Sequence, residues 1–382
     1  MKYLVLFLTY FVYQLSRILQ IIARLISGTS IRKDSNSKFS NLLTIQAGIK
    51  GLEGVFLEEL VASAIQDFGA GQVRTQPINR DRSYLIQLIS FFKLQNPKYL
   101  ILDPRTLSSN GIVGVIQSIL SCLLFSLRGI TPIVFLTDAS IIKWRIESIV
   151  WTSRYGKCVM LIPPSTLGKL FPHNRTYGPI FMPITFKTID TGLKNSDRRT
   201  SLKPKIGFSG TIYPERAEYL EAIVSSSKKL GVEVNIQEKT LSIKNEDYWR
   251  FLNDHEIIFT TTVQTNIENN LVDNLEVNQM VFRISEAISL GKILITTPVL
   301  GLDTFFKRNY DFIEIGTSES LFTECKNAIN KAINLSMSRG TKDNDSYQYL
   351  IRNKCFWRIL GINEVDICYK PKCNCLNPKL MK

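Results

Sequence analysis

The sequence is short of acidic residues and nearly without histidine. Only two histidines are present, His173 and His255, and they lie too far apart in the chain to suggest a pair of metal ligands. The 33 acidic residues are outnumbered by 47 basic ones, which leaves a formal net charge of +14. Such a chain is attracted to anionic partners: nucleic acid, an anionic membrane or a phosphorylated substrate. The basic residues are spread out without a recognisable nucleic-acid motif, so we expect no nucleic-acid partner.

The cysteines are too irregular to form a disulfide framework. There are seven, scattered along the chain, and an odd, scattered set indicates a reducing compartment. Three lie in apolar or helical patterns and are predicted to be buried thiols: Cys122, Cys158 and Cys325. The C-x4-C-x-C group of Cys368, Cys373 and Cys375 has an irregular spacing for zinc. We interpret residues 362–382 as a basic, cysteine-containing tail.

The first 28 residues combine an apolar run with a basic polar stripe. Residues 3–13 are nearly all apolar, and polar side chains then recur every three or four positions: Gln14, Arg17, Gln20 and Arg24. Residues 1–40 contain six basic residues and one acid, a local charge of +5. This combination is typical of an amphipathic helix on an anionic membrane. A signal peptide, a membrane-spanning helix and a helix of the protein's own core remain alternatives.

We expect this segment to hold the protein on the cytoplasmic face of a membrane and to contribute nothing to the catalytic fold. Residues 29–40, rich in Ser, Lys and Asn, are the expected linker. Strand and helix patterns then alternate in two sets, 41–189 and 204–361, separated by the polar stretch 190–203. This alternation predicts an α/β protein with two Rossmann-like domains, each containing a parallel, helix-covered sheet. The predicted strands are 42–47, 98–102, 132–136, 157–162, 205–208, 232–236, 257–261, 293–296 and 311–315.

Residues 278–300 are the most informative stretch of the sequence. They predict a short helix, a glycine stop at Gly291 and a buried strand, with Arg283 and Glu286 on the helix. This segment resembles the donor site of GT-B glycosyltransferases of the group 1 type, and the resemblance covers about residues 204–361. It implies two domains facing a cleft, with Glu286 binding the ribose of a nucleotide-sugar. It also implies that Arg283 lies near the phosphates, as in one branch of the family. Alternatively, Glu286 is a solvated residue with Arg283 as its i–3 salt-bridge partner.

Asn278 and Gln279, at the start of this segment, bear on which donor is bound. In many enzymes of the family a second Glu lies eight residues before the first, whereas this sequence has Asn278. This departure leaves the donor sugar open. A helix that begins near Asn278 and Gln279 offers N–H groups and a positive dipole end to a diphosphate.

Several other residues follow predicted strands, where ligands bind in open α/β sheets. Ser209, Gly210 and Thr211 precede a helix whose first turn contains Arg216, which suits a phosphate; an ordinary strand-to-helix turn is the alternative. Gly48 and Gly51 do not form a dinucleotide fingerprint. The resemblance implies that their loop lines the space between the domains.

A catalytic base is sought among residues at the ends of predicted strands. Asp138 and Asp103 each follow one and are candidates for the group that deprotonates an acceptor hydroxyl. Both are equally suited to capping a helix, and His173 is a third candidate. No D-x-D pair stands at a predicted strand end, so we expect neither an obligatory metal nor another cofactor.

The combined expectation is a membrane-associated, metal-independent glycosyltransferase. It would transfer a sugar from a nucleotide-sugar donor to a glycan or lipid-linked acceptor, in the synthesis of cell-surface polysaccharide or glycolipid. A sugar-nucleotide epimerase on the same fold and a non-catalytic nucleotide-sugar-binding protein remain the alternatives.

Overall fold

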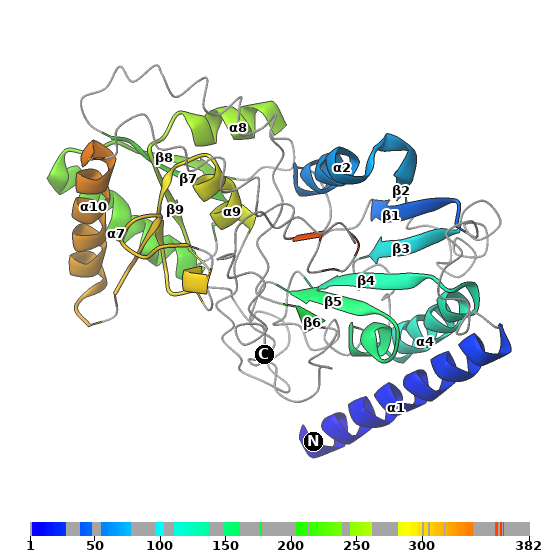
Figure 1. Ribbon diagram of the computed structural model, residues 1–382. Helices are drawn as coiled ribbons and strands as arrows, with labels where there is room; N and C mark the ends of the chain where they lie inside the picture. Colours follow the sequence, from blue (N-terminus) through cyan, green and yellow to red (C-terminus); the bar gives the residue numbers. More distant parts are fainter. Residues whose placement is uncertain are drawn as a thin grey trace.

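The computed structural model contains two α/β domains, each built around a parallel sheet (Figure 1). Among the helices that the structure describes, none is both long and apolar enough to cross a bilayer. The described residues are 2–27, 39–47, 55–77, 96–102, 111–136, 148–160, 176–177, 204–212, 214–238, 245–261, 282–299, 302–304, 306–316, 318–338, 356–357, 360 and 362.

The N-terminal domain contains a six-stranded sheet in the order β2-β1-β3-β4-β5-β6, with every neighbouring pair parallel. Its strands are β1 (Asn41–Ala47), β2 (Val73–Pro77), β3 (Pro97–Leu102), β4 (Thr131–Leu136), β5 (Lys157–Met160) and β6 (Thr176–Tyr177). The arrowheads of β3 and β5 point toward the second domain in Figure 1, so the carboxyl ends of this sheet face that domain.

Helices cover both faces of this sheet because successive side chains of a strand point to opposite faces. Tyr99 and Ile101 of β3 pack in one cluster with residues of α2 (Val55–Phe68). Leu100 and Leu102 pack in another cluster with residues of α4 (Gly111–Arg128). Strands buried on both sides read as continuous apolar runs, which is why these were predictable from the sequence.

The C-terminal domain repeats this plan with the order β11-β10-β9-β7-β8, again all parallel. Side chains of α7 and α10 pack on one face of the sheet, and side chains of α8 and α9 pack on the other. The strands are β7 (Ile206–Gly210), β8 (Val234–Glu238), β9 (Ile257–Thr260), β10 (Ile293–Thr296) and β11 (Phe312–Glu314). The helices are α7 (Pro214–Leu230), α8 (Asn245–Asn253), α9 (Phe282–Ser289) and α10 (Leu321–Ser338).

The predicted α/β class and its parallel sheets are confirmed. Several strand bounds differ from the prediction; β7, for example, ends at Gly210 and not at residue 208. β2 was not predicted, because this edge strand pairs only with β1 and its sequence VRTQP has no apolar run. β6 is only two residues long. β8 begins two residues later than predicted, because Val232 is still engaged in ending α7, where its N–H donates to the Ser227 carbonyl (3.0 Å).

The segment around Trp357 returns to the N-terminal domain, although the sequence analysis grouped it with the C-terminal one. The Trp357 indole N–H donates to Ser63 Oγ of α2 (3.1 Å), and its ring meets Phe68 edge to face. Phe356 packs against Phe135 of β4. Phe356, Trp357, Leu360 and Ile362 thus lie in one buried cluster with residues of both domains.

The first helix, α1 (Lys2–Ile26), packs along α4 of the N-terminal domain, whereas this segment was expected to contribute nothing to the catalytic fold. Ser16, Gln20 and Ala23 are buried. The Gln20 amide donates to Ser153 Oγ (2.8 Å), and the Val150 carbonyl accepts from Ser16 Oγ (3.3 Å). Polar side chains of α1 thus pair with polar groups at the end of the helix over residues 148–152. The last carbonyl groups of a helix have no partner within the helix and need such contacts.

Candidate functional site

The topology of the C-terminal sheet marks one place where a ligand is expected. From β7 the chain moves outward to β8 and then returns to the other side of β7 to form β9. This order corresponds to 2-1-3-4-5, in which the ligand site lies outside the carboxyl ends of the first and third strands. Those ends are Gly210 of β7 and Thr260 of β9.

Two arginines converge on Gly210. A Cβ atom added at this glycine would lie 2.6 Å from Arg283 Nη1 and 3.5 Å from Arg216 Nη1. Gly210 also has φ +154°, which L side chains rarely adopt. The glycine therefore admits two guanidinium groups to the backbone at the strand end, although Arg283 lies on α9 and Arg216 on α7.

Arg216 spans the point at which the strand order reverses. Its Nη1 donates to the Thr211 carbonyl after β7 (2.6 Å), and its Nη2 donates to the Thr261 carbonyl after β9 (3.3 Å). These two contacts fix the guanidinium between the strand ends. Because α7 begins at Pro214, the positive end of its dipole lies at the same edge of the sheet.

Arg283 and Glu286 are joined by a third residue, Tyr248 of α8. The Tyr248 hydroxyl donates to Glu286 Oε2 in a short hydrogen bond and accepts one from Arg283 Nε (3.3 Å). Tyr248 is buried, while Arg283 and Glu286 are half-buried. The tyrosine therefore sets the positions of both predicted site residues.

The electrostatics keep Tyr248 neutral and Arg283 charged. Burial raises the pKa of the Tyr248 hydroxyl well above its ordinary value, and the Glu286 carboxylate raises it further. Burial alone lowers the pKa of Arg283, but Tyr248 and Glu286 outweigh it, so the pKa lies above its ordinary value. The site thus holds a fixed positive charge beside Gly210.

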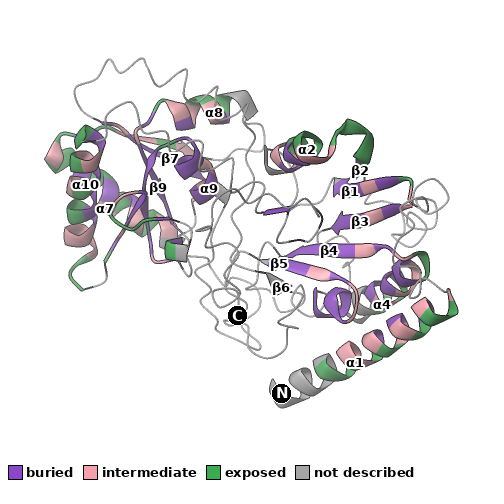
Figure 2. Ribbon diagram, in the orientation of Figure 1, coloured by how far each residue is buried: buried purple, intermediate pink, exposed green. Residues whose placement is uncertain are grey.

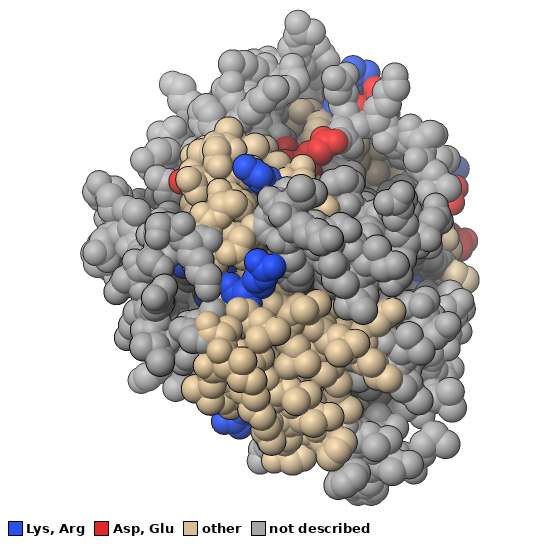
Figure 3. Space-filling view, turned by 90° about the vertical axis from the view of Figure 1, so that its right-hand side faces the viewer, with Lys and Arg blue, Asp and Glu red and all other residues tan. Residues whose placement is uncertain are grey.

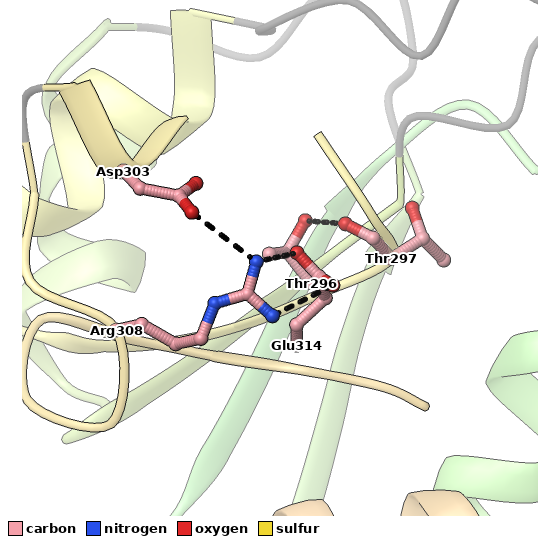
Figure 4. A network of polar contacts seen from close by, with 5 residues as sticks. All are labelled: Thr296, Thr297, Asp303, Arg308 and Glu314. Carbon is pink, nitrogen blue, oxygen red and sulfur yellow. Dashed lines mark hydrogen bonds and ion pairs between the residues drawn. The ribbon is translucent and has the colours of Figure 1, made fainter. Parts of the chain in front are cut away.

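A second arginine network nearby is satisfied internally (Figure 4). Arg308 donates through Nη1 and Nη2 to both carboxylate oxygens of Glu314 (3.0 and 3.1 Å), and its Nη2 lies 3.4 Å from Asp303. Beside it Thr296 Oγ1 donates to the Thr297 carbonyl (3.0 Å). Two carboxylates balance one guanidinium, so this network ties the chain after β10 to β11 and has no excess positive charge for an anion.

The structure brings six of the predicted site residues into one region: Ser209, Gly210, Thr211, Arg216, Arg283 and Glu286. Helix α9 begins at Phe282, so Asn278 and Gln279 lie outside the described residues, as do Gly48, Gly51, Asp103 and Asp138. Gly48 and Asp103 follow β1 and β3 in the sequence, the two strands at which the order of the N-terminal sheet reverses.

Sequence reasoning missed Tyr248 and Thr261. Tyr248 was included only in a predicted short helix, and its one signal was a hydroxyl-bearing aromatic at a core position, which is a common pattern. Among the described residues no group of three or more His, Cys, Asp or Glu side chains is suited to hold a metal ion. The three described cysteines, Cys122, Cys158 and Cys325, are buried free thiols, as predicted.

No protein-family model and no curated protein sequence matches this chain. Several solved structures have a similar fold. Anabaena HepE in complex with UDP and glucose is 11% identical, with a TM-score of 0.47 over 85% of this chain and 99% of HepE. AviGT4, a glycosyltransferase involved in avilamycin A biosynthesis, is 9% identical, with a TM-score of 0.45 over 84% and 94%. A glycosyltransferase from Rickettsia africae is 10% identical, with a TM-score of 0.44 over 85% and 97%. The second and third of these proteins are named as glycosyltransferases, and the likeness assigns no activity or substrate to this chain.

Proposed function

We propose that this protein is a glycosyltransferase that binds a nucleotide-sugar donor in its C-terminal domain. The observation that carries the proposal is the convergence of Arg283 and Arg216 on Gly210, at the strand ends where the sheet order reverses. Two fixed guanidinium groups and a helix N-terminus suit the diphosphate of such a donor. A diphosphate bound there also becomes a better leaving group, because the arginines neutralise the charge that develops on it.

The neighbouring carboxylate suits the sugar part of the nucleotide. Glu286 lies three positions after Arg283 on α9, so the two side chains share one face of the helix. A carboxylate accepts hydrogen bonds from ribose hydroxyls, and charge-assisted bonds of this kind are stronger than neutral ones. We therefore assign Arg283 and Arg216 to the diphosphate and Glu286 to the ribose.

The acceptor belongs to the N-terminal domain in this proposal. The carboxyl ends of its sheet face the second domain (Figure 1), and Asp103 and Asp138 follow β3 and β4 in the sequence. Either aspartate is proposed as the base for the acceptor hydroxyl, with Gly48 and Gly51 beside it. We propose a glycan or lipid-linked acceptor of cell-surface polysaccharide or glycolipid synthesis, reached at the cytoplasmic face of a membrane. The net charge of +14 favours an anionic membrane.

A thermal-shift screen against nucleoside diphosphates and their sugar conjugates tests the donor site. A ligand present at 100 times its dissociation constant should stabilise the protein by ~2.7 kcal/mol. Product analysis then separates the reaction classes. A transferase slowly releases free nucleoside diphosphate without an acceptor, an epimerase produces an isomer, and a binding protein produces neither.

Matched arginine variants show whether the site or the overall charge is responsible. Arg283→Met and Arg216→Met should each weaken binding of the diphosphate by roughly 10- to 100-fold, the value of a charged hydrogen bond. Arg308→Met removes the same charge from the internally satisfied network and should leave the affinity unchanged. Equal losses in all three variants would show that general electrostatic attraction, and not this site, binds the nucleotide.

A further inference from the structure

Helix α1 is oriented with its apolar side toward solvent. Figure 2 shows buried and exposed residues alternating along it. The outward side carries Phe11, Leu15, Ile18, Ile22, Leu25 and Ile26, with exposed fractions from 39% for Leu15 to 77% for Ile26. Their spacing of three or four residues places them on one face of the helix. A surface helix of a globular protein usually buries this face, so the arrangement requires a partner.

Specific contacts hold α1 in this orientation. The inward side consists of Ser16, Gln20 and Ala23, and the hydroxyls of Ser16 and Ser153 lie 3.0 Å apart. Arg24 stacks on the Tyr155 ring, with its Cζ 3.6 Å from the ring centroid. Rotating the helix about its axis would break these hydrogen bonds and leave buried polar groups without partners. The apolar face is therefore presented by a docked helix.

The neighbouring helix continues the apolar surface. Ile116, Leu120 and Leu127 of α4, the helix against which α1 packs, are exposed and lie four and seven residues apart, so they share one face. Figure 3 views the molecule from this side. It shows a broad uncharged surface over its lower part, the level of α1 and α4, with Lys and Arg side chains at its border.

All the charges of these two helices are positive. The sequences of α1 and α4 contain no Asp or Glu. Arg17 and Arg128 lie at their surface, whereas Arg24 is turned inward onto Tyr155. An apolar face flanked by basic side chains is the pattern of a segment that enters the headgroup region of an anionic bilayer. A second copy of this chain would bring the same positive charges together, which is unfavourable.

We propose that the outward apolar face of α1, with the exposed stripe of α4, is the surface through which this protein enters an anionic lipid surface. Because α1 is docked on the N-terminal domain, the domain itself is held against the lipid and is not suspended on a tether. This inference rests on the membrane location in the proposed function and names the surface responsible for it. A lipid-linked acceptor would then approach the domain from a fixed direction.

Vesicle flotation with variants that introduce acidic side chains tests this surface. The variant Ile18→Glu/Ile22→Glu/Leu25→Glu places three acids on the outward face. The control Val224→Glu/Ile236→Glu/Met337→Glu places three acids at exposed apolar positions of the C-terminal domain. Phosphatidylcholine vesicles with and without phosphatidylglycerol are the probe. Ile22→Glu alone gives a milder test, and melting temperatures show that each variant is folded.

We expect the unmodified protein and the control to float with phosphatidylglycerol vesicles, and the α1 variant to partition at least about tenfold less. Flotation of the α1 variant equal to that of the unmodified protein would overturn the proposal. So would a lipid-independent dimer that the α1 variant converts to a monomer. Nucleotide-sugar binding, measured on the same samples, is independent of this face. If the unmodified protein floats but does not bind the nucleotide-sugar, the donor site alone is overturned. If the unmodified protein binds the nucleotide-sugar but does not float, the lipid surface alone is overturned.

Discussion

Tyr248 connects Glu286 and Arg283, the two residues at the centre of the proposed donor site. Its hydroxyl bonds Glu286 and Arg283 at once, from a helix more than thirty positions earlier in the chain. The pair on α9 was predicted from the resemblance of residues 278–300 to the donor site of GT-B glycosyltransferases. The third partner could not be predicted, because its position depends on how α8 and α9 pack on the sheet.

We predict that Glu286→Ala weakens nucleotide-sugar binding by roughly 1.5–3 kcal/mol, the cost of losing a hydrogen bond to a charged group. It should also lower the stability, because the buried Tyr248 hydroxyl loses its acceptor. Isothermal titration and urea unfolding measure the two effects. Unchanged donor affinity in a folded Glu286→Ala protein would contradict the assignment of Glu286 to the ribose.

The double variant Tyr248→Phe/Glu286→Ala separates the role in binding from the role in stability. Removing both partners of a buried hydrogen bond is often nearly neutral, so the double variant should recover much of the stability lost in Glu286→Ala. Its donor affinity should stay low, since the carboxylate is still missing. Recovery of both stability and affinity would mean that Glu286 serves only the fold.

The arginines also predict how the reaction responds to chelation. Arg283 and Arg216 supply at Gly210 the positive charge that a divalent ion supplies in other phosphate sites. We therefore expect turnover to persist in excess EDTA, with an assay of released nucleoside diphosphate as the measurement. Loss of turnover that Mg²⁺ or Mn²⁺ restores would contradict this expectation.

At the scale of helices and strands, most of the C-terminal domain was predictable. Its strands are apolar runs bounded by turn residues, and β10 (Ile293–Thr296) has the predicted bounds. The prediction failed where tertiary structure decided the outcome. The α1 sequence is amphipathic, but which side faces the protein depends on the hydrogen bonds of Gln20 with Ser153 and Val150, which no periodicity reveals.

The packing of β7 against His255 gives the fold a predictable response to acid. A Cβ at Gly207 would lie 2.7 Å from the imidazole Cγ, so the ring fills the space that the glycine leaves. His255 Nδ1 donates to the Phe251 carbonyl (2.6 Å), which leaves Nε2 to accept from the Asn235 amide (3.0 Å). Burial lowers the pKa of His255, while the Phe251 carbonyl and nearby acids, Asp254 and Glu256, partly oppose this and Lys292 supports it.

We predict that stability falls as the pH drops below about 6.5, the ordinary pKa of a histidine. Below about pH 6.5 the unfolded chain binds a proton at His255, whereas the folded chain binds it only at a lower pH, below its own lowered pKa. The stabilisation is therefore complete above about pH 6.5 and is lost as the pH falls from there through the folded pKa. His255→Gln cannot bind the proton and should show a shallower loss of melting temperature between pH 7 and pH 5. Parallel profiles of the two proteins would exclude His255 as the group responsible.

At the scale of the whole molecule, the sequence predicted two domains but not how they are joined. One cluster of buried apolar side chains includes residues of α2 and the N-terminal sheet, residues of α8 and α9, and the segment 356–362. Such contacts link positions hundreds of residues apart in the sequence, and local sequence patterns do not predict them. The polar stretch 190–203 remains the predicted linker, and it lies outside the described residues.

The returning segment makes the N-terminal domain depend on the end of the chain. Trp357 is fully buried between α2 and Phe356, and Lys157 of β5 donates to the Leu360 carbonyl. Burial lowers the pKa of Lys157 to about 8. The domain is therefore completed by residues that follow the C-terminal sheet in sequence.

We predict that Trp357→Ala lowers the free energy of unfolding by about 3–5 kcal/mol, the usual cost of truncating a buried aromatic side chain. Trp357→Phe keeps most of the packing against Phe68 and loses the hydrogen bond to Ser63, so it should cost about 1 kcal/mol. Urea unfolding measures both. Donor affinity below the transition should be unchanged in both variants, because Gly210, Arg283 and Tyr248 lie on β7, α9 and α8 of the C-terminal domain, although Tyr248 belongs to the same buried cluster as Trp357. If Trp357→Ala lowers the free energy of donor binding by as much as it lowers the free energy of unfolding, the segment also shapes the donor site. The two domains would then bind the donor as one unit.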